Sequence, residues 1–434
     1  MRERERDHEV ILMGTRSPSA SELTSRETSE LTSSEPGIDK LTAIDRALAG
    51  VLARGLGTAP VRLALWDGSE LATANVRARA RVRIASRNAL IRLLVHPQLY
   101  FGECYADGSV EIDGDLPDLM TSLYEALGAP HGIHVAAADL YARFHRIHPA
   151  RSRDNVYHHY DIGNDFYRLW LDERMVYTCA YFPSPDATLE EAQVAKLDHV
   201  CRKLRLKAGE KVIEAGCGWG ALALHMADRY GARVRAFNVS HEQIEYAREM
   251  AARTGLDDRV EFIEDDYRSV TGSCDAFVSV GMLEHVGPPS YHALGRLMRH
   301  VLVPDGRGFI HTIGRPHPQP TNPWIRRRIF PDGYTPALSE MMEIFEPNGF
   351  AVLDVENLRG HYARTLEHWF SRFEAAIPRV RAMFDERFVR MWRLYLAGSI
   401  AAFRVGSMQL YQVLFARHAG ARLPLTRDDI YAAG

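Results

Sequence analysis

The chain has 434 residues, of which 46% are hydrophobic and 25% are charged, and its formal net charge is −3. These proportions are typical of a globular protein with a large core, and they exclude the strongly basic surface of most nucleic-acid-binding proteins. The sequence contains no apolar run of about 18 residues or more, so we expect no membrane-spanning helix and only peripheral membrane contact.

The N-terminal segment and the cysteines indicate a cytoplasmic protein. The segment begins MRERERDHEV and has no apolar core of a signal peptide. Residues 1–37 are rich in Ser, Thr and Glu, which predicts a disordered tail. The five cysteines form no C-x-x-C pair, which favours a reducing compartment over a disulfide framework.

Residues 38–130 are expected to form a small α+β domain. The spacing of apolar residues predicts a helix over 41–56, and the sequence at 61–68 predicts a strand that ends in a hairpin turn. Apolar and basic residues alternate over 76–84, which predicts a half-exposed strand with four arginines on one face (Arg77, Arg79, Arg81 and Arg83). Such a row is ordinarily a solvated face, and contact with lipid phosphates is the alternative.

Residues 131–434 are expected to form a second domain, and helices are predicted over about 115–150. From residue 212 to about 313 strands and helices alternate, which predicts a parallel sheet with helices on both faces. The predicted elements are strand 212–215, helix 221–230, strand 233–238, helix 241–254, strands 260–263 and 275–280, helix 290–301 and strand 307–313.

The carboxyl ends of the predicted strands are expected to form one pocket. Ligands of open parallel sheets bind beyond these ends, so residues far apart in the sequence meet there. The segments concerned are 216–220, 238–243, 265–267, 281–287 and 311–314.

A glycine-rich turn follows the first of these strands. Gly216, Gly218 and Gly220 would let the backbone approach a nucleotide-like ligand closely, although a plain tight turn uses the same residues. Glu214 precedes the glycines, which favours S-adenosylmethionine (SAM) over a dinucleotide, because SAM has no pyrophosphate that needs a bare helix N-terminus. Asn238 is neutral where a nicotinamide-dependent oxidoreductase would use an acid, so that class is disfavoured.

Three further features refine the pocket. Ser240 and Gln243 predict a capping box at the start of a helix. The acid and the ring of Asp266-Tyr267, which follow the third strand, suit the amino group and the face of adenine. The histidines and cysteines have no zinc-site spacing, so no metal is expected.

A series of longer motifs runs in consistent order through about 155–418. They are HYDIGNDFYRLWLDERMVYTCAY (159–181), EAGCGWG (214–220), NVSHEQ (238–243), SVGMLEHVG (279–287), FIHTIG (309–314), IFPDGY (329–334), HYARTLEHW (361–369) and the final helices MWRLYLAGSIAAFRVGSMQLYQVLF (391–415). This series strongly resembles the cyclopropane-fatty-acyl-phospholipid synthases and the mycolic acid cyclopropane synthases. The segment FGECYADGSVEIDG more loosely resembles the extra N-terminal domain of the longer bacterial members.

The resemblance implies a fold and a reaction. The implied fold is the α/β class I SAM-dependent methyltransferase fold, a Rossmann-like doubly wound sheet with a helical substrate cap, plus a small N-terminal α+β domain with a role in lipid binding or dimerisation. The implied reaction transfers a methylene from SAM across the cis double bond of unsaturated phospholipid acyl chains. A carbocation forms, and the family is thought to use a bound bicarbonate ion to remove the proton.

The site residues implied by the resemblance fall into two sets. The bicarbonate set is Glu284, His311 and Tyr362 with backbone groups of Cys179 and Ile313. The SAM set is Tyr177, Thr178, Gly216, Cys217, Gly218, Asn238, Val239, Ser240, Gln243, Asp266 and Tyr267.

Elementary chemistry agrees with the bicarbonate set. A carboxylate and an imidazole at two strand ends can share a small anion if a proton bridges it to Glu284. His311 is expected to donate a hydrogen bond and to titrate near neutrality, and Tyr362 adds a hydroxyl donor. In an apolar tunnel the anion would also stabilise the nearby cation.

The aromatic and thiol side chains of the first long motif are given more limited roles. The rings of Tyr177 and Tyr181 are candidates for cation–π stabilisation, whereas core packing is favoured for Trp170 and Phe182. Because alkene alkylation needs no enzyme nucleophile, Cys179 is assigned a backbone or packing role. Some relatives carry a cysteine where this chain has Ser399, which speaks against a catalytic thiol there.

A basic segment is the candidate for membrane contact. Arg326, Arg327 and Arg328 lie between bulky apolar residues of 323–330, which suits arginines on lipid phosphates at a membrane surface. A loop that covers the pocket is the alternative, and the two roles are compatible. We therefore expect a peripheral protein on the inner face of the membrane, with a phospholipid substrate, no nucleic-acid partner and a homodimer as an allowed assembly.

Two rival functions stay open from the sequence. A methyltransferase that shares the first step would leave methyl-branched or methylated unsaturated chains, because the position of the base decides how the cation is resolved. The presence of Glu284, His311 and Tyr362 favours ring closure. A non-catalytic protein that binds lipid or SAM is a rival of another class, and the glycine turn and the anion-site residues argue against it.

Overall fold

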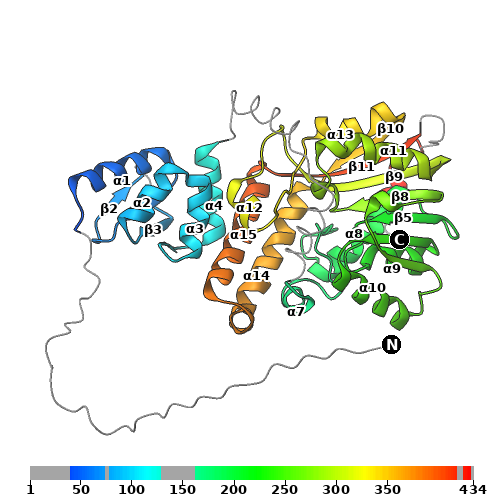
Figure 1. Ribbon diagram of the computed structural model, residues 1–434, viewed down its shortest axis with the longest axis horizontal. Coiled ribbons are helices and arrows are strands. Elements are labelled where there is room, and N and C mark those ends of the chain that lie inside the picture. Colours follow the sequence, from blue (N-terminus) through cyan, green and yellow to red (C-terminus); the bar gives the residue numbers. More distant parts are fainter. Residues whose placement is uncertain (1–39, 74–77, 129–161, 418–423, 432–434) are drawn as a thin grey trace, which may run out of the picture. The chain divides into compact units, whose positions relative to one another are not determined.

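The computed structural model describes residues 40–73, 78–128, 162–417 and 424–431 (Figure 1). The tail expected over 1–37 and the later part of the helices expected over 115–150 lie outside these ranges. The same holds for Arg77 and for the first residues of the motif at 159–181.

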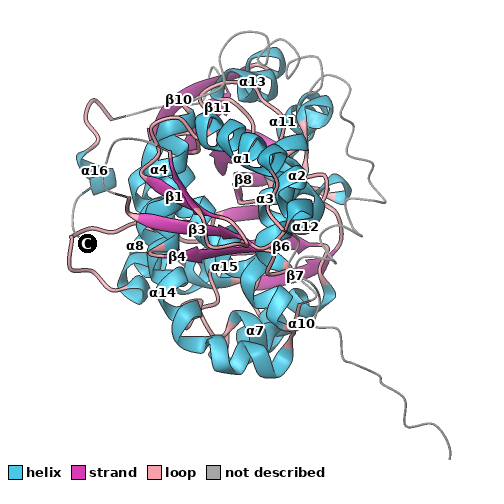
Figure 2. Cartoon of the chain, turned by 90° about the vertical axis from the view of Figure 1, so that its left-hand side faces the viewer, coloured by secondary structure: helices cyan, strands magenta, loops and turns pink. Residues whose placement is uncertain are grey.

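The N-terminal part of the described chain is a four-stranded sheet packed against helices (Figure 2). The strand order is β2-β1-β3-β4, in which β1 pairs antiparallel with β2 and parallel with β3. The strands are β1 (Val61–Ala64), β2 (Glu70–Ala72), β3 (Ala80–Ile84) and β4 (Val110–Asp113). The helices are α1 (Ala43–Gly55), α2 (Arg87–Val95), α3 (Pro97–Ala106) and α4 (Leu116–Leu127). This arrangement confirms the small α+β region and its hairpin.

The arginines of β3 form a solvated face. Arg81 lies 2.8 Å from a carboxylate oxygen of Glu70, and Arg83 lies 2.6 Å from one of Glu111. All four side chains are at least 31% exposed, so these are surface ion pairs between neighbouring strands. The structure supports the solvated-face interpretation for Arg81 and Arg83, because their charges are already paired.

The second sheet has seven strands in the order β10-β11-β9-β8-β5-β6-β7. Strands β5 to β9 are parallel where they pair, as the alternation of elements predicted. The strands are β5 (Lys211–Ala215), β6 (Arg233–Asn238), β7 (Val260–Glu264), β8 (Cys274–Val280), β9 (Leu302–Gly314), β10 (Phe350–Asn357) and β11 (Gln409–Arg417).

Strand β11 adds antiparallel pairs to the predicted parallel strands. It pairs antiparallel with both β9 and β10, so the whole sheet is mixed. It also occupies residues that were expected to continue the last helix. The preceding helix ends at Gly406, whose φ of +83° is a left-handed conformation, and residues 410–416 are then buried without a break. An apolar run buried on both faces is typical of an inner strand, and its short length does not separate it from a helix in the sequence.

The helices flank this sheet and build a cap beside it (Figure 1). They are α7 (Asn164–Tyr167), α8 (Leu189–Leu204), α9 (Ala221–Tyr230), α10 (His241–Thr254), α11 (Tyr291–Val301), α12 (Pro323–Arg328), α13 (Leu338–Phe345), α14 (Arg359–Met383), α15 (Glu386–Val405) and α16 (Asp428–Tyr431). Short 3-10 helices cover Tyr267–Ser269, Leu283–His285, Pro288–Ser290 and Glu346–Asn348. The long helices α14 and α15 lie side by side, and Trp170, Trp369 and Trp392 are fully buried in the core that they share with α7.

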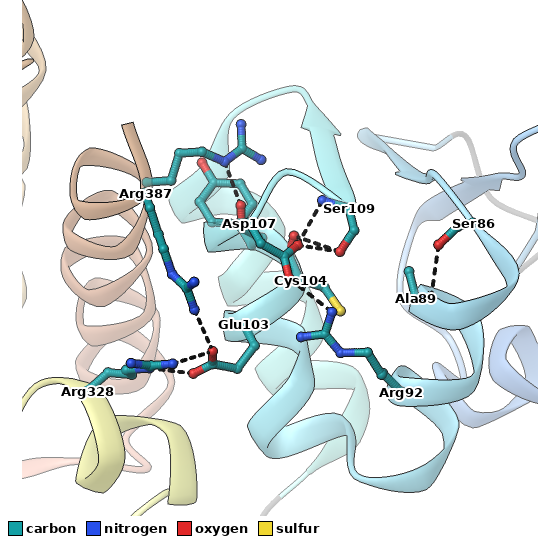
Figure 3. Close-up of polar contacts among 11 residues, drawn as sticks. Ser86, Ala89, Arg92, Glu103, Cys104, Asp107, Ser109, Arg328 and Arg387 are labelled. Carbon is teal, nitrogen blue, oxygen red and sulfur yellow. Dashed lines mark hydrogen bonds and ion pairs between the residues drawn. The ribbon is translucent and has the colours of Figure 1, made fainter. Parts of the chain in front are cut away.

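The N-terminal helices contact the cap directly. Helices α3 and α4 pack on α15, and α3 also packs on α12. Glu103 of α3 accepts hydrogen bonds from Arg328 of α12, at 2.6 and 2.7 Å, and from Arg387 of α15, at 3.0 Å (Figure 3). A Cβ on Gly102 would collide with the indole of Trp324, so glycine is what allows this close approach of α3 and α12.

Candidate active site

One cavity of about 370 Å³ lies at the carboxyl ends of β5 to β9. The structure brings together there the five segments that the strand-end rule selected. The lining residues of these segments are Gly216, Cys217, Gly218, Trp219, Asn238, Val239, Gln243, Asp265, Asp266, Tyr267, Gly281, Met282, Glu284, His285, Val286, His311 and Ile313. The segments following the strands are separated along the sequence, but parallel topology places their ends on one edge.

Gly216 and Gly218 of the glycine turn are required for two different physical reasons. Gly216 and Gly218 both have left-handed backbones, with φ of +84° and +56°. A Cβ on Gly216 would lie 2.8 Å from Cβ of Met282, so this glycine allows the turn to pack against the segment after β8. A Cβ on Gly218 would meet nothing within 4 Å, so its backbone faces open cavity. The turn therefore leaves room for a ligand at Gly218.

The polar network behind β6 differs in one detail from the sequence expectation. Oγ of Ser240 accepts a hydrogen bond from the backbone N–H of Gln243 at 3.4 Å, which confirms Ser240 as the cap of α10. The reciprocal bond of a capping box is absent here, because Oε1 of Gln243 instead accepts a bond from Nδ2 of Asn238 at 2.7 Å. Oδ1 of Asn238 accepts from the N–H of Val239 at 2.8 Å. This network holds Asn238 and Gln243 in the cavity wall.

The remaining residues of the SAM set line the same cavity, with the exception of Ser240, which is buried behind it. Oδ1 of Asp266 accepts a hydrogen bond from the backbone N–H of Arg268, which fixes the turn that presents Tyr267. The hydroxyl of Tyr177 lies 2.9 Å from that of Tyr395. Oγ1 of Thr178 accepts a bond from Nζ of Lys196 at 3.0 Å.

Glu284 is held with one oxygen occupied and one open. Its Oε1 accepts the backbone N–H of Ile313 at 2.7 Å. Its Oε2 is buried and has no hydrogen-bond partner among the described residues. Burial raises the pKa of Glu284 to about 7, against the opposing effect of the bond from Ile313. The N–H of Ile313 therefore positions the carboxyl group instead of facing the cavity as a free donor.

His311 is buried and neutral, which corrects the expectation that it titrates near neutrality. Burial lowers the pKa of His311 well below 6.5, and the positive charges of Lys196 and Lys203 lower it further. Nε2 of Gln412 lies 3.2 Å from Nδ1 of His311 and donates to it, which places the ring proton on Nε2. His311 Nε2 has no partner among the described residues. The imidazole thus offers one buried N–H to the cavity.

Two further members of the bicarbonate set, Tyr362 and Cys179, are placed on the cavity wall. The Tyr362 ring packs against Phe403, with ring centroids 4.5 Å apart. Sγ of Cys179 lies 3.1 Å from the carbonyl oxygen of Ala180, and burial raises the pKa of this thiol far above its usual range. A thiol that stays protonated is a poor nucleophile, which agrees with a packing role.

Only one of the four aromatic candidates for cation stabilisation lines the cavity. That residue is Tyr177, whereas Trp170 is fully buried in the helical core. Tyr181 stacks between His199 and His361, and Phe182 stacks on His368. The packing interpretation therefore extends from Trp170 and Phe182 to Tyr181.

Comparison with known proteins agrees with this geometry. A family model described as "Mycolic acid cyclopropane synthetase" matches residues 148–413, and a domain of unknown function matches 51–129. The chain is 38% identical to a "Probable fatty acid methyltransferase" of Pseudomonas putida over 86% of this chain and 96% of that protein. It is 37% identical to a "Cyclopropane-fatty-acyl-phospholipid synthase" of Escherichia coli (strain K12), over 79% of this chain and 89% of that protein.

This chain belongs to the mycolic acid cyclopropane synthetase family. The crystal structure of a mycolic acid cyclopropane synthase complexed with SAH and CTAB superposes with a TM-score of 0.58 at 32% identity, and covers 61% of this chain and 97% of its own. The fold is accordingly that of a class I SAM methyltransferase with an added N-terminal region, and the chain is a SAM-dependent transferase of this family.

The residues present fit the two small molecules that the family implies. For SAM, the observation is the open space at Gly218 together with the buried Oε2 of Glu214, which has no partner among the described residues. For a small anion, it is the pair of buried atoms, Oε2 of Glu284 and Nε2 of His311, that line one cavity without partners in the described chain.

Sequence reasoning missed several residues of this site. Lys196 is 1% exposed and lines the cavity, where burial lowers its pKa and the carboxylate of Asp172 opposes that shift. Gln412 and Tyr395 act through contacts with His311 and Tyr177. Lys196 lies outside the motifs, whereas Tyr395 and Gln412 lie within the motif at 391–415. All three have the sequence spacing of ordinary core positions, so nothing in the sequence marks them as site residues.

Among the described residues, none of the helices has the length and hydrophobicity that crossing a bilayer requires. No group of three or more His, Cys, Asp or Glu side chains there is arranged to hold a metal ion.

Proposed function

We propose that this enzyme transfers a methylene group from SAM across the cis double bond of unsaturated phospholipid acyl chains and closes a cyclopropane ring. The observation that carries the proposal is the pair of buried, unpartnered polar atoms of Glu284 and His311 in the cavity that also contains the glycine turn. A methyltransferase that leaves an unsaturated chain must also remove a proton, so what favours ring closure here is a base held beside the transferred carbon.

The chemistry divides between the bound molecules and the chain. SAM would supply an electrophilic methyl group to the alkene and would leave as S-adenosylhomocysteine, with the C–S electron pair kept by sulfur. Bicarbonate, held by Glu284, His311 and Tyr362, would supply a base beside the transferred carbon.

The chain's own residues then control the carbocation. Glu284, whose pKa is raised to about 7, keeps a proton with which to hold an anion at neutral pH. His311 donates from Nε2 in its neutral form, which its burial enforces. The aromatic face of Tyr177 lines the cavity and attracts a nearby cation. Burial of the site excludes water, which would otherwise trap the cation as an alcohol.

Glu284→Gln tests the proposal, because it keeps the shape of the side chain and changes its charge and proton pattern. Ring formation should fall by roughly 10²-fold or more, the usual size of a lost general-base contribution. SAM affinity, measured by calorimetry, should stay at the wild-type value. Glu249→Gln, an exposed change on α10, is the matched control.

Removing bicarbonate from the buffer should slow the wild-type enzyme, and adding it back should restore the rate. Cyclopropane formation at the wild-type rate by Glu284→Gln would place the base elsewhere.

A fatty acid methyltransferase is the second candidate function. It is favoured by the 38% identity to the protein named "Probable fatty acid methyltransferase". Such an enzyme would give methyl-branched or methylated unsaturated chains from the intact site. Mass spectrometry of lipids from cells that express the chain separates these products from the ring, since a methylated unsaturated chain keeps a double bond that hydrogenation removes.

The same proposal includes the cellular location of the enzyme and the division of the chain into domains. We place the enzyme in the cytoplasm at the inner face of the membrane, bound peripherally through the basic segment of α12. The chain is divided into a tail (1–37), an N-terminal domain (38–130) and a catalytic domain (131–434). A homodimer stays a prediction, which sedimentation analysis of the purified protein would test.

A further inference from the structure

Arg315 is a cavity residue that the proposed reaction does not use. It follows β9 directly, and its side chain lines the cavity. Its backbone N–H donates to the carbonyl of Pro336 at 2.8 Å, and its backbone forms a parallel bridge with Ala337. The backbone that carries this guanidinium is therefore fixed.

The side chain of Arg315 contacts only neutral acceptors among the described residues. Nε donates to Oγ1 of Thr335 at 2.6 Å, and one Nη donates to the carbonyl of Pro320 at 3.3 Å. No carboxylate of the described chain forms an ion pair with it, in contrast to Arg328, which is bound by both oxygens of Glu103. A guanidinium carries several N–H donors, so these two bonds leave donors available.

Glu340 acts on the charge of Arg315 but forms no ion pair with it. Burial lowers the pKa of Arg315, while its attraction to Tyr124, Tyr334 and Glu340 opposes the shift. Both oxygens of Glu340 are occupied at 2.6 and 2.7 Å, one by the hydroxyl of Tyr334 and the other by the N–H of Ala337. Arg315 is half-buried, so its charge is partly withdrawn from water without a bound counter-ion, and an anion in the cavity would offset that cost.

The cavity around Arg315 has a polar part and an apolar part. Thr335 bonds to Arg315, and Tyr124 of α4 lines the same cavity as these two residues. The same cavity is also lined by the rings of Phe330 and Tyr395, which pack on one another with centroids 5.7 Å apart. One positive charge and an aromatic lining in the same cavity suit an amphiphile with an anionic head.

We propose that Arg315 binds the phosphate of the acyl substrate, assisted by the hydroxyl of Tyr124 that α4 brings from the N-terminal region. This assignment rests on the proposed function, since it names the headgroup of the same substrate. A planar guanidinium matches the oxygens of a phosphate and forms the stronger, charge-assisted kind of hydrogen bond. The same chemistry would accept a free phosphate ion, so the experiment separates the two sources.

The test compares two lipids that differ only in the headgroup phosphate. Phosphatidylglycerol and diacylglycerol with the same cis-unsaturated chains are presented in the same detergent micelles to the full-length enzyme. For Arg315→Gln we expect KM for phosphatidylglycerol to rise roughly ten- to a hundredfold, the size of a lost charged hydrogen bond. KM for diacylglycerol and SAM affinity should not change. Arg315→Lys should recover part of the loss, and Arg253→Gln, an exposed arginine on α10, is the matched control.

A binding measurement separates this inference from the reaction. Phosphatidylglycerol micelles are titrated into the SAH-loaded enzyme and followed by tryptophan fluorescence, which requires no turnover. Weaker binding by Arg315→Gln supports the headgroup site even if the wild-type enzyme converts neither lipid, an outcome that would refute the proposed function alone. An equal loss for both lipids would show that Arg315 only holds the loop at 315–337. If inorganic phosphate alters turnover of the wild type while phosphatidylglycerol binds both proteins equally, the site takes free phosphate and the lipid assignment is wrong.

Discussion

Burial sets the protonation of individual residues in this site. Glu284 and His311 are drawn in opposite directions by the same cause, because burial disfavours the charged form of each. Glu284 thus keeps a proton near neutrality, and His311 stays neutral. Two side chains that would both be charged at mildly acidic pH in water become a pair of neutral hydrogen-bonding groups. The same two groups also make the stability of the protein depend on pH.

Replacing Glu284 with Gln should change how stability depends on pH. The pKa of Glu284 rises from 4.5 to about 7 on folding, so its contribution is fully present below pH 4.5 and is lost as pH rises through about 7. Relative to wild type, Glu284→Gln should therefore gain stability between about pH 4.5 and pH 7. Urea unfolding at a series of pH values measures the difference. An identical pH profile for both proteins would show that the carboxyl group is solvated, and Glu249→Gln controls for the loss of one carboxylate.

The arginines of the short helix α12 lie in two different environments. Arg328 is bound to Glu103 of α3, whereas Arg327 is exposed. Trp324 of the same helix packs on Gly102 of α3. The basic triplet read from the sequence as one membrane surface is therefore split, because one of its members faces the N-terminal helices.

The split predicts different results for different arginines of α12. Arg326→Ser with Arg327→Ser should weaken sedimentation with anionic vesicles by about 1 kcal/mol for each residue. Arg328→Ser should instead lower the melting temperature, because it leaves the buried carboxylate of Glu103 with one partner fewer. Neutral vesicles are the control. Equal vesicle binding by the double variant and the wild type at low salt would exclude α12 as the docking site.

At the scale of the whole molecule, the N-terminal region helps to build the cavity. Phe101 and Gly102 of α3 line it, together with Met120 and Tyr124 of α4. Glu103 is the ionic anchor of this contact and is 6% exposed. The substrate side of the site thus depends on contacts between helices that are distant in the sequence, while the glycine turn depends on the large sheet.

Glu103→Gln should affect lipid turnover more than SAM binding. The change removes the charge that holds Arg328 and Arg387, at a cost of about 2 kcal/mol for charged hydrogen bonds. Lipid conversion should fall while SAM affinity, measured by calorimetry, stays constant. Glu70→Gln is the matched control, since Glu70 forms only exposed ion pairs with Arg62 and Arg81. A parallel fall in SAM affinity would show that Glu103 supports the whole fold and not the lipid side.

Much of the fold was predictable because its signals are local. The bounds of β6 and α10 agree with the predicted elements, since alternating burial and the caps Ser240 and Gly255 act within a few residues. Strand β11 was mistaken for helix because seven consecutive buried residues show neither period. The capping box was half wrong because Asn238, which lies before the helix, competes for the side chain of Gln243.

The sequence by itself determined that five strand ends converge on one site, because parallel connections of one hand place all carboxyl ends on the same edge. It also determined the chemistry available there, through Glu284, His311 and the glycine turn. The protonation states and the hydrogen-bond partners of these side chains were decided only by the tertiary structure. The tautomer of His311 is set by its contact with Gln412, which is 101 residues away in the sequence. The side chain of Arg328 is held by Glu103, which is 225 residues away. The burial and the pairing of a side chain depend on neighbours from the whole chain, so no local sequence pattern predicts them. For that reason the roles of Arg315 and Lys196 could be inferred only from the folded protein.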